Sequence, residues 1–255
     1  MRKIFVISWL VIMRTLGMRL SAQNWEMWTG VGADFSLGEK FTLETKELNS
    51  FQPDDNMAFN FAQIGLGLNY KINSDFSIEG GDQLNIIPSS SRTPRNRVYF
   101  RGTYTWRFSD VLKSTHALQF ELHGANEIRY DERIILINGI STRNRYTPIN
   151  IRPSLSYWLY YNIGGDPVQY YDEVGNKTVK QAANGFHRGR LYFSLNSKLS
   201  DHFNMSVYVM HQDEFNLFTS AEHEINVVSP NTGNIARDFN EYNVIGLSLN
   251  FDIGN

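Results

Sequence analysis

The feature that most constrains the fold is a repeat of two residues, apolar then polar, that recurs along the chain after residue 23. In 25–37, seven residues from Trp25 to Leu37 share one face, while Glu26, Asp34 and their even-numbered neighbours share the other. A period of two over this length is typical of a β-strand, because a helix repeats about every 3.6 residues. Similar segments occupy 62–72, 97–108, 116–130, 145–161, 187–199 and 244–253, with weaker ones at 40–48, 76–87 and 203–213. The pattern predicts an all-β chain of ten clear antiparallel strands.

Strand length and the polar face favour one of the two architectures that alternating antiparallel strands can build. The strong segments are long, and a membrane-spanning strand needs about 9–11 residues. Charged residues also stand in the middle of these segments, as suits the polar lumen of a transmembrane barrel. The residues expected to face this lumen are Arg97, Arg101, Arg107, Glu121, His123, Glu127, Arg129, Arg152, Arg188 and Arg190. The sequence therefore predicts an antiparallel up-and-down transmembrane β-barrel with ten strands, or twelve.

Aromatic residues and connection lengths agree with this prediction. Several rings are expected near strand ends, where outer-membrane barrels carry aromatic girdles; they are Trp25, Tyr70, Trp106, Tyr157 and Tyr161. Short turns with a Ser-Asp signature occur at 73–75, 108–110 and 200–202, and long polar connections at 49–58, 87–96, 131–144, 162–185 and 214–240. Short turns at one rim and long loops at the other are typical of such barrels. Two long connections in succession, 131–144 and 162–185, leave the strand count open, because either a strand hides in 168–181 or one connection is a long periplasmic turn.

The N-terminal segment differs from everything after it. Residues 1–22 contain a basic start, an apolar run over 4–13 and a small residue, Ala22, before Gln23. This is the pattern of a secretory signal peptide, and ten apolar residues are too few for a transmembrane helix. We therefore expect cleavage near Ala22/Gln23, export, and a single outer-membrane barrel domain over 23–255. Removing the segment leaves 20 basic and 26 acidic residues, a mildly acidic mature chain.

Composition excludes several classes of protein. The mean hydropathy of −0.36 argues against a bundle of transmembrane helices, each of which needs about 20 consecutive apolar residues. The absence of cysteine from all 255 residues excludes disulfides, thiolate zinc sites and a cysteine nucleophile. The 24 basic and 26 acidic residues nearly balance, so the composition gives no reason to expect a nucleic-acid partner.

Motifs that carry chemistry are sparse. The chain has no Gly-rich phosphate loop, no His-Glu-x-x-His pair and no Gly-x-Ser-x-Gly elbow. His123 shares a face with Glu121 and Glu127, a group that suits either a proton or metal site or a hydrogen-bonded lumen histidine. No catalytic residue, metal or cofactor is predicted, and we expect no enzymatic activity.

The chain also resembles a known family. The signal peptide, the first strand beginning at Trp25, the arginine-containing middle strands and the late block 186–200 are similar to the exported β-barrel family catalogued as domain of unknown function 2490. The aromatic-Arg start of that block and the turn at Ser200-Asp201 fit the same family. The resemblance implies an outer-membrane location in Gram-negative bacteria. It implies no activity and no site residues, because the family has none established.

Three functions remain open from the sequence. The first is a non-enzymatic outer-membrane barrel, structural or a narrow pore, whose outer loops bind a ligand. Its partners are outer-membrane lipid, the barrel-assembly machinery and an unidentified small solute or surface ligand. The second is an outer-membrane enzyme that modifies lipid, which needs a Ser/His or acid/base cluster at the outer rim; mutation of His123 or His211 should then abolish hydrolysis. The third is a soluble periplasmic barrel that holds an apolar ligand, which requires the apolar faces to form the interior.

Overall fold

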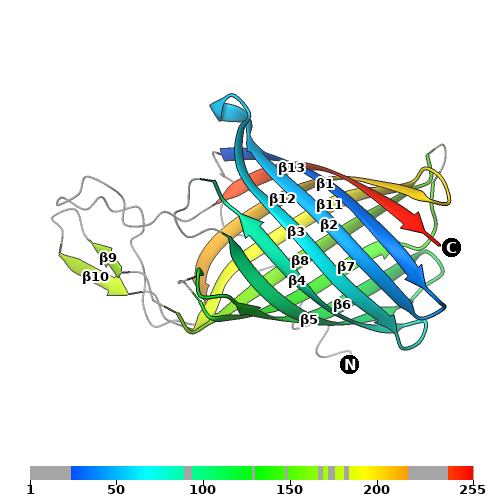
Figure 1. Ribbon diagram of the computed structural model, residues 1–255, viewed down its shortest axis with the longest axis horizontal. Helices are drawn as coiled ribbons and strands as arrows, with labels where there is room; N and C mark the ends of the chain where they lie inside the picture. The colour runs from blue at the N-terminus through cyan, green and yellow to red at the C-terminus, as the bar shows by residue number, and fades with distance from the viewer. Residues whose placement is uncertain are drawn as a thin grey trace.

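The computed structural model describes residues 24–88, 94–127, 130–146, 149–165, 169–171, 176–180, 184–217 and 241–254. The segment expected to be a signal peptide and the candidate residue Arg129 lie outside these ranges. Figure 1 shows a barrel of long, tilted strands with a small separate hairpin beyond one end. Within the described ranges, no helix is long and apolar enough to cross a membrane.

Within the described part of the chain, eleven strands close into one barrel. They are β1 (Asn24–Leu37), β2 (Phe41–Gln52), β3 (Ala58–Lys71), β4 (Phe76–Ile86), β5 (Arg95–Trp106), β6 (Leu112–His123), β7 (Glu132–Thr142), β8 (Ile151–Ile163), β11 (Gly185–Lys198), β12 (Phe203–Leu217) and β13 (Tyr242–Ile253). β9 (Gln169–Tyr171) and β10 (Lys177–Lys180) form the separate hairpin, and a 3₁₀ turn, η1 (Pro53–Asp55), follows β2. The predicted all-β barrel is confirmed.

The barrel closes through a parallel pair. Neighbouring strands are antiparallel everywhere except at the seam between β1 and β13, where Asn24 pairs with Tyr242 and Phe35 with Ile253. An odd number of up-and-down strands leaves the first and last running in the same direction. Parallel strands can still pair through evenly spaced, slanted hydrogen bonds. The count of eleven therefore lies between the even numbers, ten and twelve, that the sequence favoured.

The strand that the alternation missed is β7. The prediction treated 131–144 as a connection, but Glu132–Thr142 pairs along its length with both β6 and β8. Ile135 lies on the inward face and is 2% exposed, while Leu136 lies on the outward face. Apolar residues on both faces hide a period of two. With β7 in place, the connection after it returns to the same end as the short turns, and no barrel strand is needed in 168–181.

The connections differ between the two ends of the barrel, as expected, with one exception: the β7–β8 connection, 143–150, lies at the end that otherwise has short turns and is longer than the β2–β3 connection, 53–57, at the opposite end. The end with turns 38–40, 72–75, 107–111 and 199–202 is called the short-turn rim, and the opposite end the long-loop rim. Side chains stabilise these turns: Asn73 Oδ1 accepts hydrogen bonds from the backbone N–H groups of Asp75 and Phe76, each 2.9 Å long. At the last turn, Lys198 donates a 2.8 Å hydrogen bond to Asp201 and lowers the pKa of that exposed carboxyl group.

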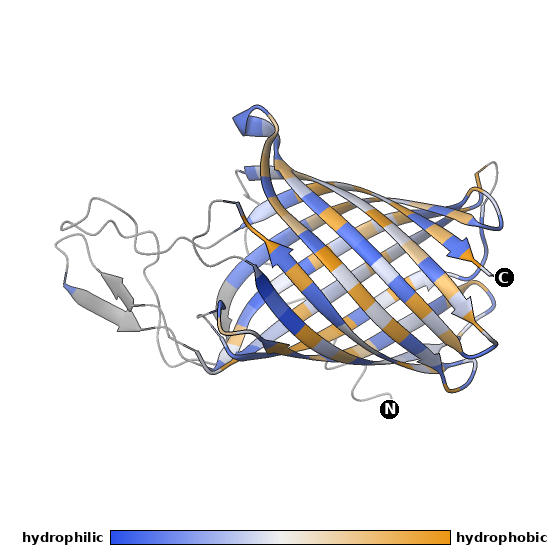
Figure 2. Cartoon of the chain, in the orientation of Figure 1, coloured by the Kyte–Doolittle hydropathy of each residue, from blue (hydrophilic) through white to orange (hydrophobic). Residues whose placement is uncertain are grey.

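The two faces of the wall are opposite in character. Outward residues include Leu66, Phe100 and Leu118, each more than half exposed, and Figure 2 shows apolar residues distributed over the whole wall. Inward residues include Glu121 at 1% and Gln212 at 0% exposure. The molecule therefore places polar side chains in its interior and large apolar side chains on its surface. One of the expected girdle residues departs from the prediction, since Tyr157 lies in the middle of β8 and is buried.

Candidate functional site in the barrel interior

Most of the candidate residues line a single cavity. This cavity, called the arginine chamber, has a volume of about 640 Å³. The predicted residues that line it are Arg97, Arg101, Glu121, Glu127, Arg188 and Arg190. Its lining also includes Ile87, which follows β4, and Glu127, which follows β6. Both strands end at the long-loop rim, so the chamber lies in that half of the barrel.

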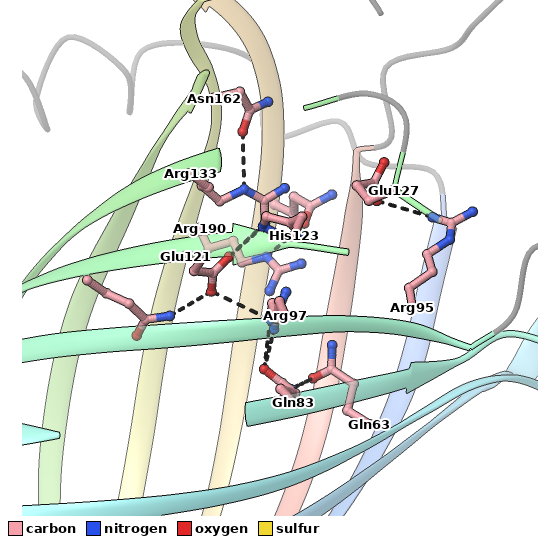
Figure 3. Close-up of polar contacts among 12 residues, drawn as sticks. Gln63, Gln83, Arg95, Arg97, Glu121, His123, Glu127, Arg133, Asn162 and Arg190 are labelled. Carbon is pink, nitrogen blue, oxygen red and sulfur yellow. Dashed lines mark hydrogen bonds and ion pairs between the residues drawn. The ribbon is translucent and has the colours of Figure 1, made fainter. Parts of the chain in front are cut away.

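Glu121 is the centre of the charged network in the chamber wall. Its Oε2 lies 3.1 Å from His123 Nε2 and 3.7 Å from Arg133 Nη1, and its Oε1 lies 3.6 Å from Arg97 Nε (Figure 3). Gln119 donates a 2.6 Å hydrogen bond to the same carboxylate. Alternation on β6 places Gln119, Glu121 and His123 on one face, and strand pairing brings Arg97 and Arg133 to them from either side. One buried carboxylate therefore faces two guanidinium groups.

A second ion pair crosses the next part of the wall. Arg101 Nη1 lies 3.2 Å from Glu79 Oε2, and the hydroxyl of Tyr99 donates a 2.6 Å hydrogen bond to Glu79 Oε1. The Tyr99 ring lies over Gly67 and Gly81, where any side chain would collide with its hydroxyl group. Small residues on β3 and β4 therefore make room for the ring that positions Glu79.

Arg190 has a different environment. Its Nε donates a 2.7 Å hydrogen bond to Gln212, and its Nη2 donates one of 3.3 Å to the hydroxyl of Tyr242. The guanidinium carbon lies 5.5 Å from the ring centroids of both Trp28 and Tyr160. Among the described residues, no carboxylate lies within ion-pair distance of Arg190. Neutral partners and ring faces therefore hold this cation.

Sequence reasoning missed several residues of the chamber. Arg133 lies in the strand that the alternation did not identify, and its guanidinium carbon lies 4.0 Å from the ring centroid of Tyr130. Glu79, the partner of Arg101, lies in the weaker segment 76–87, and Glu214, the partner of Arg188, lies one residue beyond the weaker segment 203–213. The charged residues in those segments were the available signal, because a carboxylate in mid-strand needs a cationic partner when it faces inward.

The family model described as protein of unknown function DUF2490 matches residues 25–220, from β1 to the end of β12. The chain belongs to the DUF2490 family. No curated protein and no solved structure matches it significantly.

Two other candidates lie outside the arginine chamber of this DUF2490 protein. Arg107 follows the end of β5 at the short-turn rim and forms an ion pair with Asp75, with 40% of its side chain exposed. Arg152 lines a separate cavity of about 440 Å³ together with Lys113 and Asp252. The alternation gave Arg152 the correct face, but strand position places it nearer the other end of the barrel.

His123 and His211 of this DUF2490 chain each contact a neighbouring carboxylate. His123 pairs with Glu121, whereas Glu127 forms an ion pair with Arg95 at 3.3 Å. His211 lies on the outward face of β12, and its two ring nitrogens lie 2.9 Å from Asn243 Oδ1 and 2.8 Å from Asp213 Oδ1. Within the described ranges, no group of three His, Cys, Asp or Glu side chains is placed to hold a metal ion.

The interior cavities follow one another along the β1–β13 seam. Ser248 on β13 lines both the arginine chamber and the 440 Å³ cavity. Asp34 and Asp252 line that second cavity and also a third, of about 550 Å³, at the short-turn rim. Gly30 is the register partner of Ser248 across the seam. Because Gly30 has no side chain, the inward space beside Ser248 is bordered by small residues. Among the described residues of the DUF2490 barrel, these three cavities therefore form a row.

Proposed function

We propose that this protein is an integral outer-membrane β-barrel whose lumen forms a narrow, non-enzymatic pore. The observation that carries the proposal is the exposed outer wall of large apolar side chains around an interior of ion-paired charges. A lipid bilayer lowers the free energy of an exposed apolar wall. A closed barrel also pairs the backbone N–H and C=O groups of each strand with its neighbours, which is necessary because lipid cannot form hydrogen bonds with them. The barrel strands have 11 to 15 residues, enough to span a membrane when tilted.

Aromatic contacts near both ends of the outer wall support a membrane location. At the short-turn rim, the ring centroids of Phe41 and Tyr70 are 4.7 Å apart, and Trp106 is 41% exposed. At the long-loop rim, Tyr161 and Phe186 are 4.9 Å apart. Rings at these heights match the aromatic girdles of outer-membrane barrels, where one end of each ring meets lipid and the other meets water.

The alternatives receive less support. A soluble barrel that holds an apolar ligand needs its apolar faces inside, and the arrangement here is the reverse. A lipid-modifying enzyme centred on His211 needs a free ring nitrogen to activate a nucleophile. Asn243 and Asp213 occupy both nitrogens of that ring.

The row of cavities supports the pore. A solute that enters the arginine chamber meets Ser248 before the second cavity, and Asp34 and Asp252 before the short-turn rim. Ion pairs and rings fill much of the lumen, so the passage is narrow. A barrel of about eight strands is already filled by side chains, and eleven strands leave limited additional space.

The location is tested by fractionating cells that express the full chain and sequencing the N-terminus of the mature protein. We expect the protein in the outer-membrane fraction, a new N-terminus at Gln23, and faster migration without boiling. Depleting the barrel-assembly machinery should remove the fast form. Recovery as a soluble periplasmic protein would contradict the proposal.

The pore is tested by conductance in planar bilayers. Ser248→Phe places a ring where the first two cavities meet and should reduce conductance at least fivefold. Leu247→Phe, on the outward face one residue away, is the matched control and should leave conductance unchanged. Equal conductance in both variants, or none in the unmodified protein, would contradict the pore while leaving the membrane location in place.

A further inference from the structure

We propose that the arginine chamber is a binding site for a small organic anion that carries a carboxylate on a ring. The inference deepens the proposed pore by naming its solute class, and it rests on that proposal only for its biological role. Binding itself is a property of the folded barrel in detergent. It can therefore succeed or fail independently of conductance and of cellular location.

The first step is the charge around the chamber. Four guanidinium groups line this one chamber: those of Arg97, Arg133, Arg188 and Arg190. The carboxylates paired with them are Glu121 and Glu214. Glu26 also lines the chamber, so these four cations face three carboxylates, an excess of one positive charge among the described residues. The other charged residues of the lining form ion pairs of their own: Lys46 with Glu44, Arg101 with Glu79 and Glu127 with Arg95. Figure 3 shows Arg97, Arg133 and Arg190 extending into the same part of the lumen.

The second step is that Arg190 is the one of these four guanidinium groups with no described carboxylate within ion-pair distance. Glu26 accepts hydrogen bonds from three neutral donors: Trp28 Nε1 at 2.7 Å, Ser50 Oγ at 2.8 Å and Asn60 Nδ2 at 3.2 Å. Arg190 lies over the ring of Trp28, whose N–H group donates to Glu26, and the three neutral donors already satisfy this carboxylate. A cation removed from bulk water without a counter-ion is costly, and an anion that reaches it recovers part of that cost.

The third step is the shape and chemistry of the lining. Aromatic side chains surround the guanidinium groups; those of the central part are Trp28, Trp158, Tyr160, Tyr192, Tyr208 and Tyr242. Flat faces with hydroxyl edges suit a cyclic body that is apolar on its faces and polar at its rim. The volume of about 640 Å³ lies within the usual range of small-ligand sites. A planar guanidinium binds a carboxylate through two parallel hydrogen bonds, which fixes the orientation of the bound ring.

The test is isothermal titration calorimetry on the full mature chain in detergent micelles. The probes are galacturonate and benzoate, which carry a carboxylate on a ring, galactose, which has the ring without the charge, and inorganic phosphate, which has charge without a ring. We expect both ring carboxylates to bind at least tenfold more tightly than galactose or phosphate. Arg190→Gln should weaken them at least tenfold, and Arg190→Lys should recover part of the affinity.

The controls separate a lost site from a lost fold. Arg107→Gln removes an arginine at the short-turn rim and should leave probe affinity unchanged. Arg190→Gln must keep the heat-dependent gel mobility of the folded barrel. If its barrel does not form, iodide and caesium quenching of Trp28 and Trp158 fluorescence replaces that comparison, measured in a Trp25→Phe/Trp106→Phe variant that lacks the two exposed tryptophans. An electropositive chamber predicts stronger quenching by iodide. Equal quenching by both ions, or ring carboxylates that bind no better than galactose, would overturn the proposal.

Discussion

The ring of Tyr208 on β12 lies directly across Gly246 on β13, so close that a Cβ atom at position 246 would overlap the ring. The same ring packs 6.0 Å from the ring of Tyr192 and borders the buried cluster of Trp28, Met210, Tyr242 and Val244. The seam strand therefore carries a glycine because an inward ring occupies the space of its side chain.

Gly246→Ala is expected to lower the free energy of unfolding by about 1–3 kcal/mol, because overpacking displaces Tyr208 and the cluster beside it. Gly80→Ala is the matched control, since a Cβ there meets only the backbone oxygen of Tyr99 at 3.9 Å. Urea-induced unfolding in micelles, followed by gel mobility, measures both variants. Similar midpoints for the two variants would contradict the packing described.

Glu121→Gln tests the centre of the charged network. The substitution leaves Arg97, Arg133 and His123 beside a neutral amide, and loss of one partner of a buried ion pair costs about 3–5 kcal/mol. Glu39→Gln, in the exposed first turn, provides the comparison and should change little. The same urea titration measures the difference. A loss below about 1 kcal/mol at position 121 would show that the network adds little to stability.

An engineered disulfide tests the parallel seam. Thr29 and Leu247 are register partners on the outward faces of β1 and β13, and paired strands bring Cα atoms within the range that a disulfide needs. The chain has no cysteine, so no native thiol competes. Thr29→Cys with Leu247→Cys should cross-link on oxidation, as seen by mobility on a non-reducing gel. Thr29→Cys with Ile253→Cys should not, and equal cross-linking of both pairs would contradict the register.

Leu118→Arg tests the outer wall at mid-height. In a bilayer, an arginine facing lipid near the midplane costs about 2–4 kcal/mol, and near an interface about 0–1 kcal/mol. Val111→Arg, in a turn at the short-turn rim, is therefore the control. Refolding into lipid vesicles should fall for the first variant and not for the second. For a barrel in water, both substitutions would be tolerated alike.

Much of the fold could be predicted because a half-buried strand records its two faces in alternate residues. That signal located ten strands and failed at β7, where Ile135 faces inward beside outward Leu136 and the alternation disappears. The odd count followed from this missed strand. No local pattern encodes whether a seam is parallel, since that depends only on how many strands precede it.

The interior could be predicted in part. Arginines in mid-strand identified much of the chamber. One face of each strand is apolar and points outward, so an arginine on the opposite face must point into the lumen. The aromatic lining was less visible: Trp28 and Tyr242 belong to the interior, but a ring fits either a lipid face or a lumen. The ion-pair partners depend on register between strands, which alternation within one strand does not specify.

The most direct test of the central claim, that the apolar wall faces lipid, uses single cysteines at Leu118 and Gln119, labelled with a nitrobenzoxadiazole fluorophore after refolding into vesicles. Leu118 is 54% exposed on the outward face and Gln119 is 4% exposed on the inward face. Brominated lipid should quench the probe at 118 and leave the probe at 119 unaffected. Quenching at 118 by aqueous iodide, with no effect of brominated lipid, would contradict the account.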